Sequence, residues 1–139
     1  MKALDPATII RCAADVLAGA VKPPRLVVLF GSHARGTAHD DSDIDLGFLP
    51  GEKMSLAEEL ALEAELTRTL EHEVDLVPLD TDDTMLKWRA ARDGVVVRAV
   101  PPMEAARFFA RAAVEHDEMA PTLEEAGRRF ARRLAIGNR

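Results

Sequence analysis

The chain has 139 residues, a length typical of one compact domain, and 47% of its residues are hydrophobic, which supplies one core. Its net charge of −6 argues against a general nucleic-acid binder, which needs a basic surface to displace counterions from phosphate. No apolar run reaches the ~18–20 residues that span a membrane, and the N-terminus carries an acid and a proline where a signal peptide is apolar. We therefore expect a single domain over residues 1–139, located in the cytoplasm.

The first half of the chain predicts a helix followed by two strands. Asp5, directly before a proline, is a favourable helix start, and apolar residues then recur at helical spacing. This periodicity predicts that Cys12 is a core-facing thiol. Because Cys12 is the only cysteine of the chain, both an internal disulfide and a Cys-based zinc site are excluded. Residues 26–30 form a continuous apolar run of strand length. A short glycine-bounded turn at 31–36 follows, and residues 43–49 predict the second strand.

A longer helix is predicted after this second strand. Ser55 and Glu58 have the spacing of a capping box, in which each side chain accepts a hydrogen bond from the other residue's backbone N–H. The leucines predicted to mark the buried side of the helix are Leu56, Leu60, Leu66 and Leu70.

The remaining chain continues the alternation of strands and helices. The predicted elements are a strand at 73–79, a helix at 83–92 with Met85 and Trp88 in the core, a strand at 95–100, and helices at 103–118 and 122–135. This order predicts an α/β (α+β) fold with a mixed sheet of about four strands flanked by helices. Apolar stripes in the helices at 103–135 suit either packing on the sheet or docking of a partner.

The C-terminus is basic, in contrast to the chain as a whole. From Ala126 onward there is no acid, and the residues are compatible with a docking face or with a solvated helix surface. The arginines of this tail are Arg128, Arg129, Arg132, Arg133 and Arg139.

Gly31 and Ser32 come directly after the first strand and open a short helix. Unpaired backbone N–H groups at such a helix start attract phosphate, and Gly31 lets a ligand approach the backbone closely. The Ser32 hydroxyl adds one more donor. A Gly-Ser turn alone is common in α/β proteins, so its meaning depends on what lies beside it. The neighbouring loop histidines, His33 and His39, are expected to face water, with contact to a nucleotide as the alternative.

Three aspartates are the candidate catalytic residues. Asp43 and Asp45 stand two apart in the second strand, so their side chains share one face a few ångströms apart. Two carboxylates held so close repel unless a cation neutralises them, and oxygen ligands of this type suit Mg²⁺. Asp75 stands in the apolar third strand, where an unpaired charge is costly. We expect it to be the third carboxylate of the site.

Together these residues resemble a known family. The pattern of Gly31-Ser32, ten residues and Asp-x-Asp, with Ala-Arg-Gly inside and Ser42 before the first aspartate, closely resembles the minimal nucleotidyltransferases of the polymerase-beta superfamily. More narrowly, it resembles the MNT antitoxins that pair with HEPN-domain toxins. The resemblance covers about residues 24–100 and includes Asp75.

The resemblance implies a nucleotidyltransferase fold and a role for each motif residue. Gly31 and Ser32 would hold the nucleotide triphosphate, with ATP as the donor. Asp43 and Asp45 would carry two Mg²⁺ ions, while Asp75 would share one metal and act as base toward the acceptor hydroxyl. The further residues that would contact the nucleotide or brace its loop are Arg35 and Ser42.

The resemblance also implies a partner, because the acceptor in this group is a tyrosine hydroxyl of the HEPN toxin. This chain has no tyrosine, which excludes modification of its own tyrosines. We expect a hetero-oligomer with a HEPN ribonuclease toxin, silenced by AMP transfer, and no direct nucleic-acid binding. Two alternatives stay open: an antitoxin that acts by binding alone, and a transferase for a small molecule.

Overall fold

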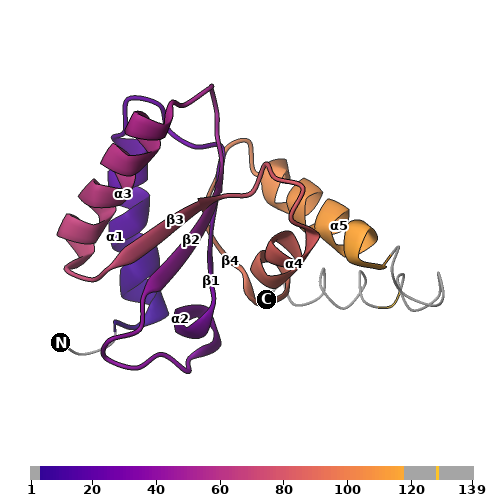
Figure 1. The fold of residues 1–139 in the computed structure, drawn as a ribbon, viewed down its shortest axis with the longest axis horizontal. Helices are drawn as coiled ribbons and strands as arrows, with labels where there is room; N and C mark the ends of the chain where they lie inside the picture. The colour runs from indigo at the N-terminus through magenta and orange to yellow at the C-terminus, as the bar shows by residue number, and fades with distance from the viewer. Residues whose placement is uncertain (1–3, 118–127, 129–139) are drawn as a thin grey trace.

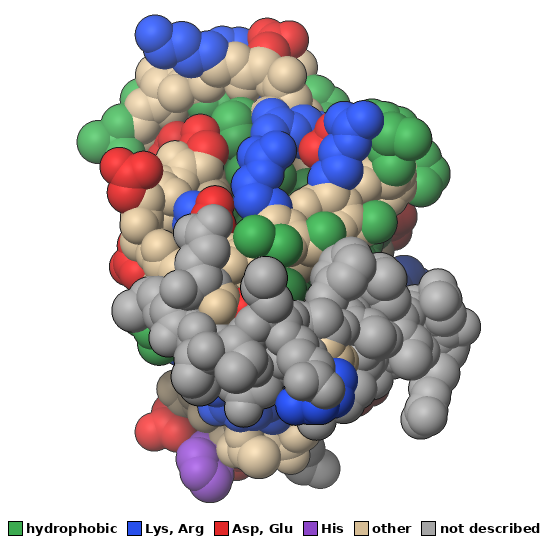
Figure 2. All heavy atoms as spheres, turned by 90° about the vertical axis from the view of Figure 1, so that its right-hand side faces the viewer, with side chains coloured by type: hydrophobic (Ala, Val, Ile, Leu, Met, Phe, Trp, Pro, Cys, Tyr) green, Lys and Arg blue, Asp and Glu red, His purple; other side chains and the backbone are tan. Residues whose placement is uncertain are grey.

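The computed structural model describes residues 4–117 and residue 128. The elements in chain order are α1 (Pro6–Ala18), β1 (Leu26–Phe30), α2 (Ser32–Arg35), β2 (Ile44–Leu49), α3 (Leu56–Leu70), β3 (Val74–Pro78), α4 (Thr84–Asp93), β4 (Val95–Ala99) and α5 (Met103–Asp117). Helices α1 and α3 cover one face of the sheet, α4 and α5 cover the other, and α2 lies at one end (Figure 1). Seen from the α5 side, the surface combines hydrophobic side chains with lysines and arginines (Figure 2).

The sheet contains both parallel and antiparallel pairs. Its strand order is β3-β2-β1-β4, with β1 antiparallel to both of its neighbours and β2 parallel to β3. Every residue of β1 is buried, because this central strand has helices on both of its faces. A four-stranded mixed sheet flanked by helices confirms the predicted fold class.

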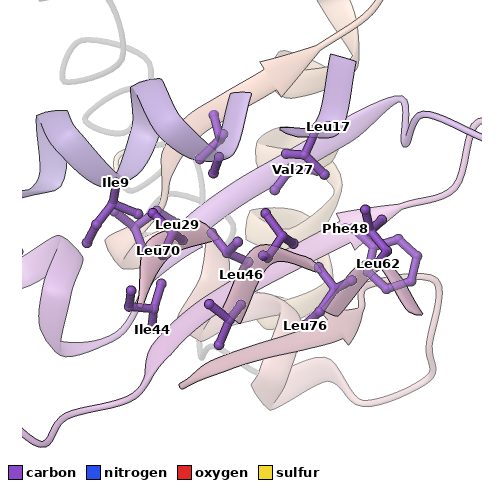
Figure 3. Packing of buried hydrophobic residues seen from close by; sticks show 14 residues of the cluster. Ile9, Leu17, Val27, Leu29, Ile44, Leu46, Phe48, Leu62, Leu70 and Leu76 are labelled. Atoms are coloured by element: carbon purple, nitrogen blue, oxygen red, sulfur yellow. The ribbon is translucent and has the colours of Figure 1, made fainter. Parts of the chain in front are cut away.

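Alternate residues of the strands enter two different cores. Val27 and Leu29 of β1 join the core under α1 and α3, which is drawn in Figure 3. Val28, between them, faces α4 and α5 instead. Cys12 is partly buried against the α1–α3 core, as predicted. The strand residues that form the α1–α3 core with β1 are Ile44, Leu46, Phe48, Val74, Leu76 and Val97.

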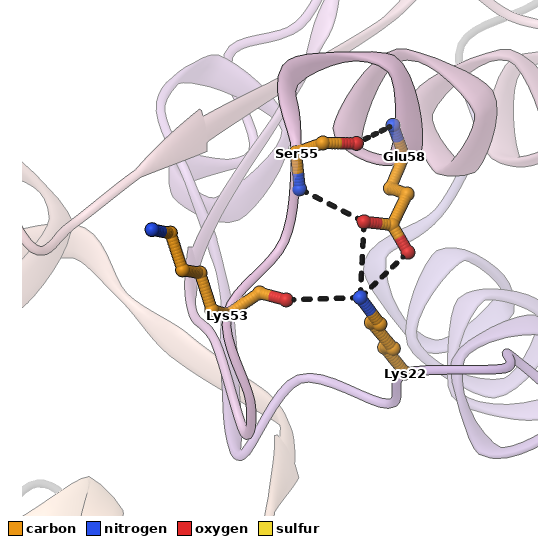
Figure 4. Close-up of polar contacts among 4 residues, drawn as sticks. All are labelled: Lys22, Lys53, Ser55 and Glu58. Atoms are coloured by element: carbon orange, nitrogen blue, oxygen red, sulfur yellow. Dashed lines mark hydrogen bonds and ion pairs between the residues drawn. The ribbon is translucent and has the colours of Figure 1, made fainter.

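The two predicted helix starts are confirmed. The Asp5 carboxylate accepts from the Thr8 backbone N–H at 2.9 Å and caps α1. At α3 the capping box is complete, since Ser55 and Glu58 each accept from the other's backbone N–H (Figure 4). Lys22, beyond the end of α1, donates to the Glu58 carboxylate at 3.0 Å and ties the two helices together.

The predicted buried side of α3 is partly wrong. Leu56 and Leu60 are 70% and 53% exposed, and the buried leucines are Leu62, Leu66 and Leu70. Successive helix residues turn by about 100°, so residues four apart stay on one side, whereas Leu60 lies about 120° around the helix from Leu66. The sheet contacts the stripe formed by Leu62, Leu66 and Leu70, whereas Leu56 and Leu60 lie outside this stripe and are exposed.

The strand β3, which forms one edge of the sheet, is held by side chains of α3. The Val74 backbone N–H donates to the Thr67 hydroxyl at 3.1 Å, and the Leu76 N–H donates to the Glu63 carboxylate at 2.9 Å. Both N–H groups point away from β2, toward the open side of β3, and on that side an edge strand normally leaves its donors unpaired. These two bonds fix the strand that carries Asp75.

The C-terminal predictions are only partly covered by the structure. Helix α5 is described as far as Asp117, whereas the helix predicted at 122–135 and the basic tail other than Arg128 lie outside the described residues. The single-domain assignment for residues 1–139 and the docking role of 103–135 stay predictions. Within residues 4–117 and 128, no helix is both long enough and apolar enough to cross a membrane.

Candidate active site

The sheet register brings the predicted motif residues together at the end where α2 lies. Phe30, the last residue of β1, pairs with Asp45 of β2, and Asp45 pairs with Asp75 of β3. Gly31 follows Phe30 directly, so the start of α2 stands beside the aspartates. Asp43 precedes β2 by one residue. Segments that lie 44 residues apart in the chain, at 31 and 75, therefore meet at one sheet end.

The strands aim two of the aspartates toward the α4 side of the sheet. Ile44 and Leu46 are fully buried in the α1–α3 core, so Asp45 between them points to the opposite face. The same alternation around Asp75 turns its side chain to that face. Asp43 and Asp75 are exposed and Asp45 is half-buried. A large substrate can therefore reach the carboxylates from the surface.

The carboxylates repel one another. Burial raises the pKa of Asp45, and the negative charges of Asp75 and Asp43 raise it further. The positive charges of Arg89 and Arg35 act in the opposite direction but do not cancel the shift. The site is therefore electrostatically prepared for a cation.

The oxygen atoms of the aspartates suit Mg²⁺ that is also coordinated by the phosphates of a bound substrate. All of the candidate ligands are carboxylate oxygens, which Mg²⁺ prefers, and it commonly binds only one or two carboxylates plus substrate phosphates. Among the described residues, no group of three or more His, Cys, Asp or Glu side chains is arranged so that it could hold a metal ion, and this includes Asp43, Asp45 and Asp75. The assignment of Asp43, Asp45 and Asp75 as metal ligands stays a prediction.

Gly31 is required by its conformation and by its neighbour. Its φ of 75° and ψ of −156° lie in a region that essentially only glycine adopts. A Cβ at this position would stand 2.3 Å from Oδ2 of Asp45, closer than real Cβ contacts occur. The backbone at the start of α2 thus approaches the central carboxylate as closely as glycine permits.

A hollow of about 220 Å³ opens beside Asp45. Its walls combine the start of α2 with the C-terminal half of α4. The lining residues are Phe30, Gly31, Ser32, Arg35, Asp45, Arg89 and Asp93. The hollow is thus lined by two carboxylates, Asp45 and Asp93, and by two arginines, and this mixture of charges suits a phosphate group with a bound cation.

The two arginines of the hollow differ in their contacts. Arg35 is paired with Asp93 at 2.9 Å, which braces α2 against α4. Burial alone would raise the pKa of Asp93, but the hydrogen bonds that Arg92 and Arg35 donate to its carboxylate outweigh burial and lower the pKa. Arg89 has no ion pair within the described part of the chain and is exposed. The sequence interpretation missed Arg89, although its spacing of four from Asp93 puts both on one helix face.

The structure places the other predicted contacts outside the hollow or corrects them. Ser42 accepts a hydrogen bond from the His39 backbone N–H at 2.7 Å and orders the loop before Asp43; its role toward a nucleotide stays a prediction. His39 is exposed as expected, but the prediction that His33 faces water is wrong, because that ring is only 1% exposed. Burial lowers the pKa of His33. Its ring lies edge to face with the ring of His72, with centroids 6.1 Å apart.

The core prediction for the α4 side chains is partly wrong as well. Met85 is 56% exposed, because it lies on the outer side of α4. Trp88 is half-buried and stacks on His116 of α5, with ring centroids 4.0 Å apart. It therefore joins the two helices on this face of the sheet.

A larger hollow, of about 420 Å³, lies at the opposite end of the sheet near α5, the side shown in Figure 2. It contains none of the predicted catalytic residues. Two of its cations are already neutralised, since Arg25 pairs with Glu104 and Lys87 pairs with Glu115. Size therefore does not identify the site, and the smaller hollow beside the carboxylates is the candidate.

Comparison with known proteins finds a family that matches most of the chain. The family described as Polymerase beta, Nucleotidyltransferase matches residues 15–99, a range that contains every candidate catalytic residue. The protein adenylyltransferase MntA of Shewanella oneidensis is 34% identical over 70 residues. That stretch covers 50% of this chain, and the chain spans only half the length of this relative.

Solved structures share the fold. A toxin–antitoxin structure with AMP-PNP matches with a TM-score of 0.70 at 24% identity, covering 91% of this chain and 94% of the other. A complex of a tri-AMPylated Shewanella oneidensis HEPN toxin with an MNT antitoxin matches with a TM-score of 0.65 at 20% identity, covering 94% and 93%. At these identities the likeness concerns the fold.

Proposed function

The chain belongs to the Polymerase beta nucleotidyltransferase family, and from this premise we propose that it is an antitoxin that transfers AMP from ATP to a tyrosine of a HEPN-domain ribonuclease toxin. Two relatives support this proposal. One is named a protein adenylyltransferase, and another is the MNT antitoxin bound to an AMPylated HEPN toxin. The chain itself has no tyrosine, so a tyrosine acceptor belongs to a partner.

The observation that carries the proposal is the pairing of Asp45 with Asp75 next to Gly31. Strand pairing sets two carboxylates side by side at the same level of the sheet, and Asp43 adds a third charge. A structural role does not account for this arrangement, because like charges directly opposite each other destabilise a sheet. A nucleotidyltransferase uses such a group to hold cations at the phosphates.

The residues that would hold two Mg²⁺ ions are Asp43, Asp45 and Asp75. When bound, such ions offset the charge of the phosphates and stabilise the attacking and leaving oxygens in phosphoryl-type transfer. Burial raises the pKa of Asp45 and the charges of Asp75 and Asp43 raise it further, and a cation beside this carboxylate would favour its charged form against both effects.

The start of α2 and the cations of the hollow would orient the triphosphate. The Ser32 hydroxyl is a hydrogen-bond donor in the wall of the hollow, and Arg89 supplies a cation without an ion pair among the described residues. Arg35 would act mainly as a brace, since it is already paired with Asp93.

The reaction would be an in-line displacement at the α-phosphorus of ATP. The tyrosine oxygen of the toxin forms a bond to that phosphorus, the bond to the bridging oxygen breaks, and pyrophosphate leaves. The hydroxyl proton passes to Asp75, whose exposed position at the sheet edge lets it reach an acceptor on another protein.

Mass spectrometry of the partner tests this proposal. The chain, incubated with its HEPN partner, ATP and Mg²⁺, should add one AMP unit to a toxin tyrosine, and Asp45→Asn should abolish the addition without unfolding the protein. A toxin with that tyrosine replaced by phenylalanine is the control. Absence of any modified toxin residue, with AMP transferred instead to a small hydroxyl compound, would identify a small-molecule transferase.

Cell growth separates catalysis from binding. Wild-type chain should relieve the growth arrest caused by the toxin, and Asp45→Asn should not, because only a covalent AMP persists after the two proteins separate. Equal protection by the variant would show that binding alone neutralises the toxin.

A further inference from the structure

Two histidines are buried next to the candidate site, although neither has a place in the proposed chemistry. His33, on α2, is 1% exposed, and His72, just before β3, is 6% exposed. Their rings meet edge to face with centroids 6.1 Å apart. Polar side chains buried this deeply ordinarily have a hydrogen-bonding reason.

His33 has one such bond, and it reaches a residue of the site. Its Nδ1 lies 3.0 Å from the backbone carbonyl oxygen of Asp43. A carbonyl only accepts, so Nδ1 must carry the hydrogen and donate it. His33 therefore joins the helix that begins with Ser32 to the residue that opens the Asp-x-Asp pair.

The peptide group after Asp43 is held at both of its ends. Its carbonyl oxygen accepts from His33, and its N–H, which belongs to Ile44, donates to the Glu73 carbonyl at 2.9 Å. Glu73 directly precedes β3, the strand of Asp75. One peptide plane thus connects α2, β2 and β3 at the sheet end that carries the candidate aspartates.

We propose that His33 is a positioning residue that fixes Asp43 for metal binding through this backbone hydrogen bond. The inference rests on the proposed function, because it assumes that Asp43 is a metal ligand. Asp43 is exposed and stands at the end of the loop that crosses from α2, so its direction depends on how its backbone is anchored. Partners that orient metal ligands in this way typically contribute ~10–100-fold to metal affinity.

His72 does not share this role. Both of its ring nitrogens are buried without a hydrogen-bond partner among the described residues. Replacing it with an apolar side chain removes no hydrogen bond and changes only packing, so His72 is the control for burial beside His33.

The test uses two replacements of similar size at position 33. In His33→Asn the amide nitrogen stands as far along the side chain as Nδ1 does in histidine, so it keeps the donor, whereas His33→Leu lacks any donor. Mn²⁺ binding in the presence of AMP-PNP is measured for the full chain by electron paramagnetic resonance, which needs no turnover. Thermal denaturation shows which variants are folded.

We expect His33→Leu to weaken Mn²⁺ affinity by ~10-fold or more, while His33→Asn and His72→Leu bind close to the wild-type affinity. Equal binding by folded His33→Leu, or an equal loss in His72→Leu, would overturn the inference. If His33→Leu is unfolded, His33→Asn decides: retained affinity supports the role of the donor, and lost affinity contradicts it. If the wild type itself binds no Mn²⁺ with the analogue, the proposed function fails, and the inference fails with it.

Discussion

Gly31→Ala should damage both stability and catalysis, whereas Gly36→Ala should damage stability alone. Both glycines have positive φ, 75° and 76°, at the two ends of α2. Gly36 lies in the left-handed helical region and a Cβ there meets nothing within 4 Å, so alanine costs about 1–2 kcal/mol of conformational strain. Gly31 lies in the region reserved for glycine, where strain costs about 1–3 kcal/mol.

The difference between the two positions is Asp45. A Cβ on residue 31 would stand 2.3 Å from its Oδ2, so the carboxylate must move away. A misplacement of about 1 Å in a catalytic group can cost about 10²-fold in rate. Urea denaturation measures the stability of both variants, and AMP transfer to the partner measures their activity. Wild-type transfer by Gly31→Ala, or an equal loss in Gly36→Ala, would refute the reasoning.

Three further predictions concern the helices that surround the sheet. Glu63→Ala should lower the free energy of unfolding by about 1–3 kcal/mol, because it leaves the buried Leu76 N–H without its acceptor. Glu65→Ala is the control on the exposed side of α3, and it should change the free energy of unfolding little in the same urea denaturation experiment. Hydrogen bonds from Ser55 and Lys22 lower the pKa of Glu58 from 4.5 to about 2, so the contribution of Glu58 to stability is present above about pH 4.5 and is lost as the pH falls toward 2. The difference in the free energy of unfolding between wild type and Glu58→Gln should therefore shrink as the pH falls through that window. A difference that grows instead would show that the capping box is not its source. Arg89→Ala should weaken ATP binding by about 1.5–3 kcal/mol in calorimetric titrations if it contacts phosphate, and unchanged affinity would assign the arginine to the surface.

Local signals in the sequence predicted the parts of the fold that depend on local chemistry. The Asp5 cap and the Ser55–Glu58 box were correct, because a cap involves residues three apart. The apolar run at 26–30 correctly predicted a strand, and residues 73–79 correctly predicted the strand that carries Asp75. Leu60 was misassigned, because it lies about 120° around the helix from Leu66 and does not share the buried side with it.

The site depended more on pairings between distant segments. Spacing predicted Asp43 and Asp45 on one face, but only the parallel register of β2 and β3 sets Asp75 beside Asp45. The pairing of Arg35 with Asp93 joins residues 58 positions apart, and nothing local indicates it. His33 was expected in water, because a loop position does not reveal the ring's contact with a carbonyl ten residues later.

The rate of AMP transfer by Asp75→Asn tests the central claim most directly. The measurement is a single-turnover reaction with the HEPN partner, and ATP affinity is titrated for the same protein. Loss of the general base should lower the rate by ~10²–10⁴-fold, while ATP still binds, because Asp43, Asp45 and the Gly31–Ser32 turn remain in place. A wild-type rate in the variant would contradict the assignment of Asp75 as the base and with it the catalytic account of this site.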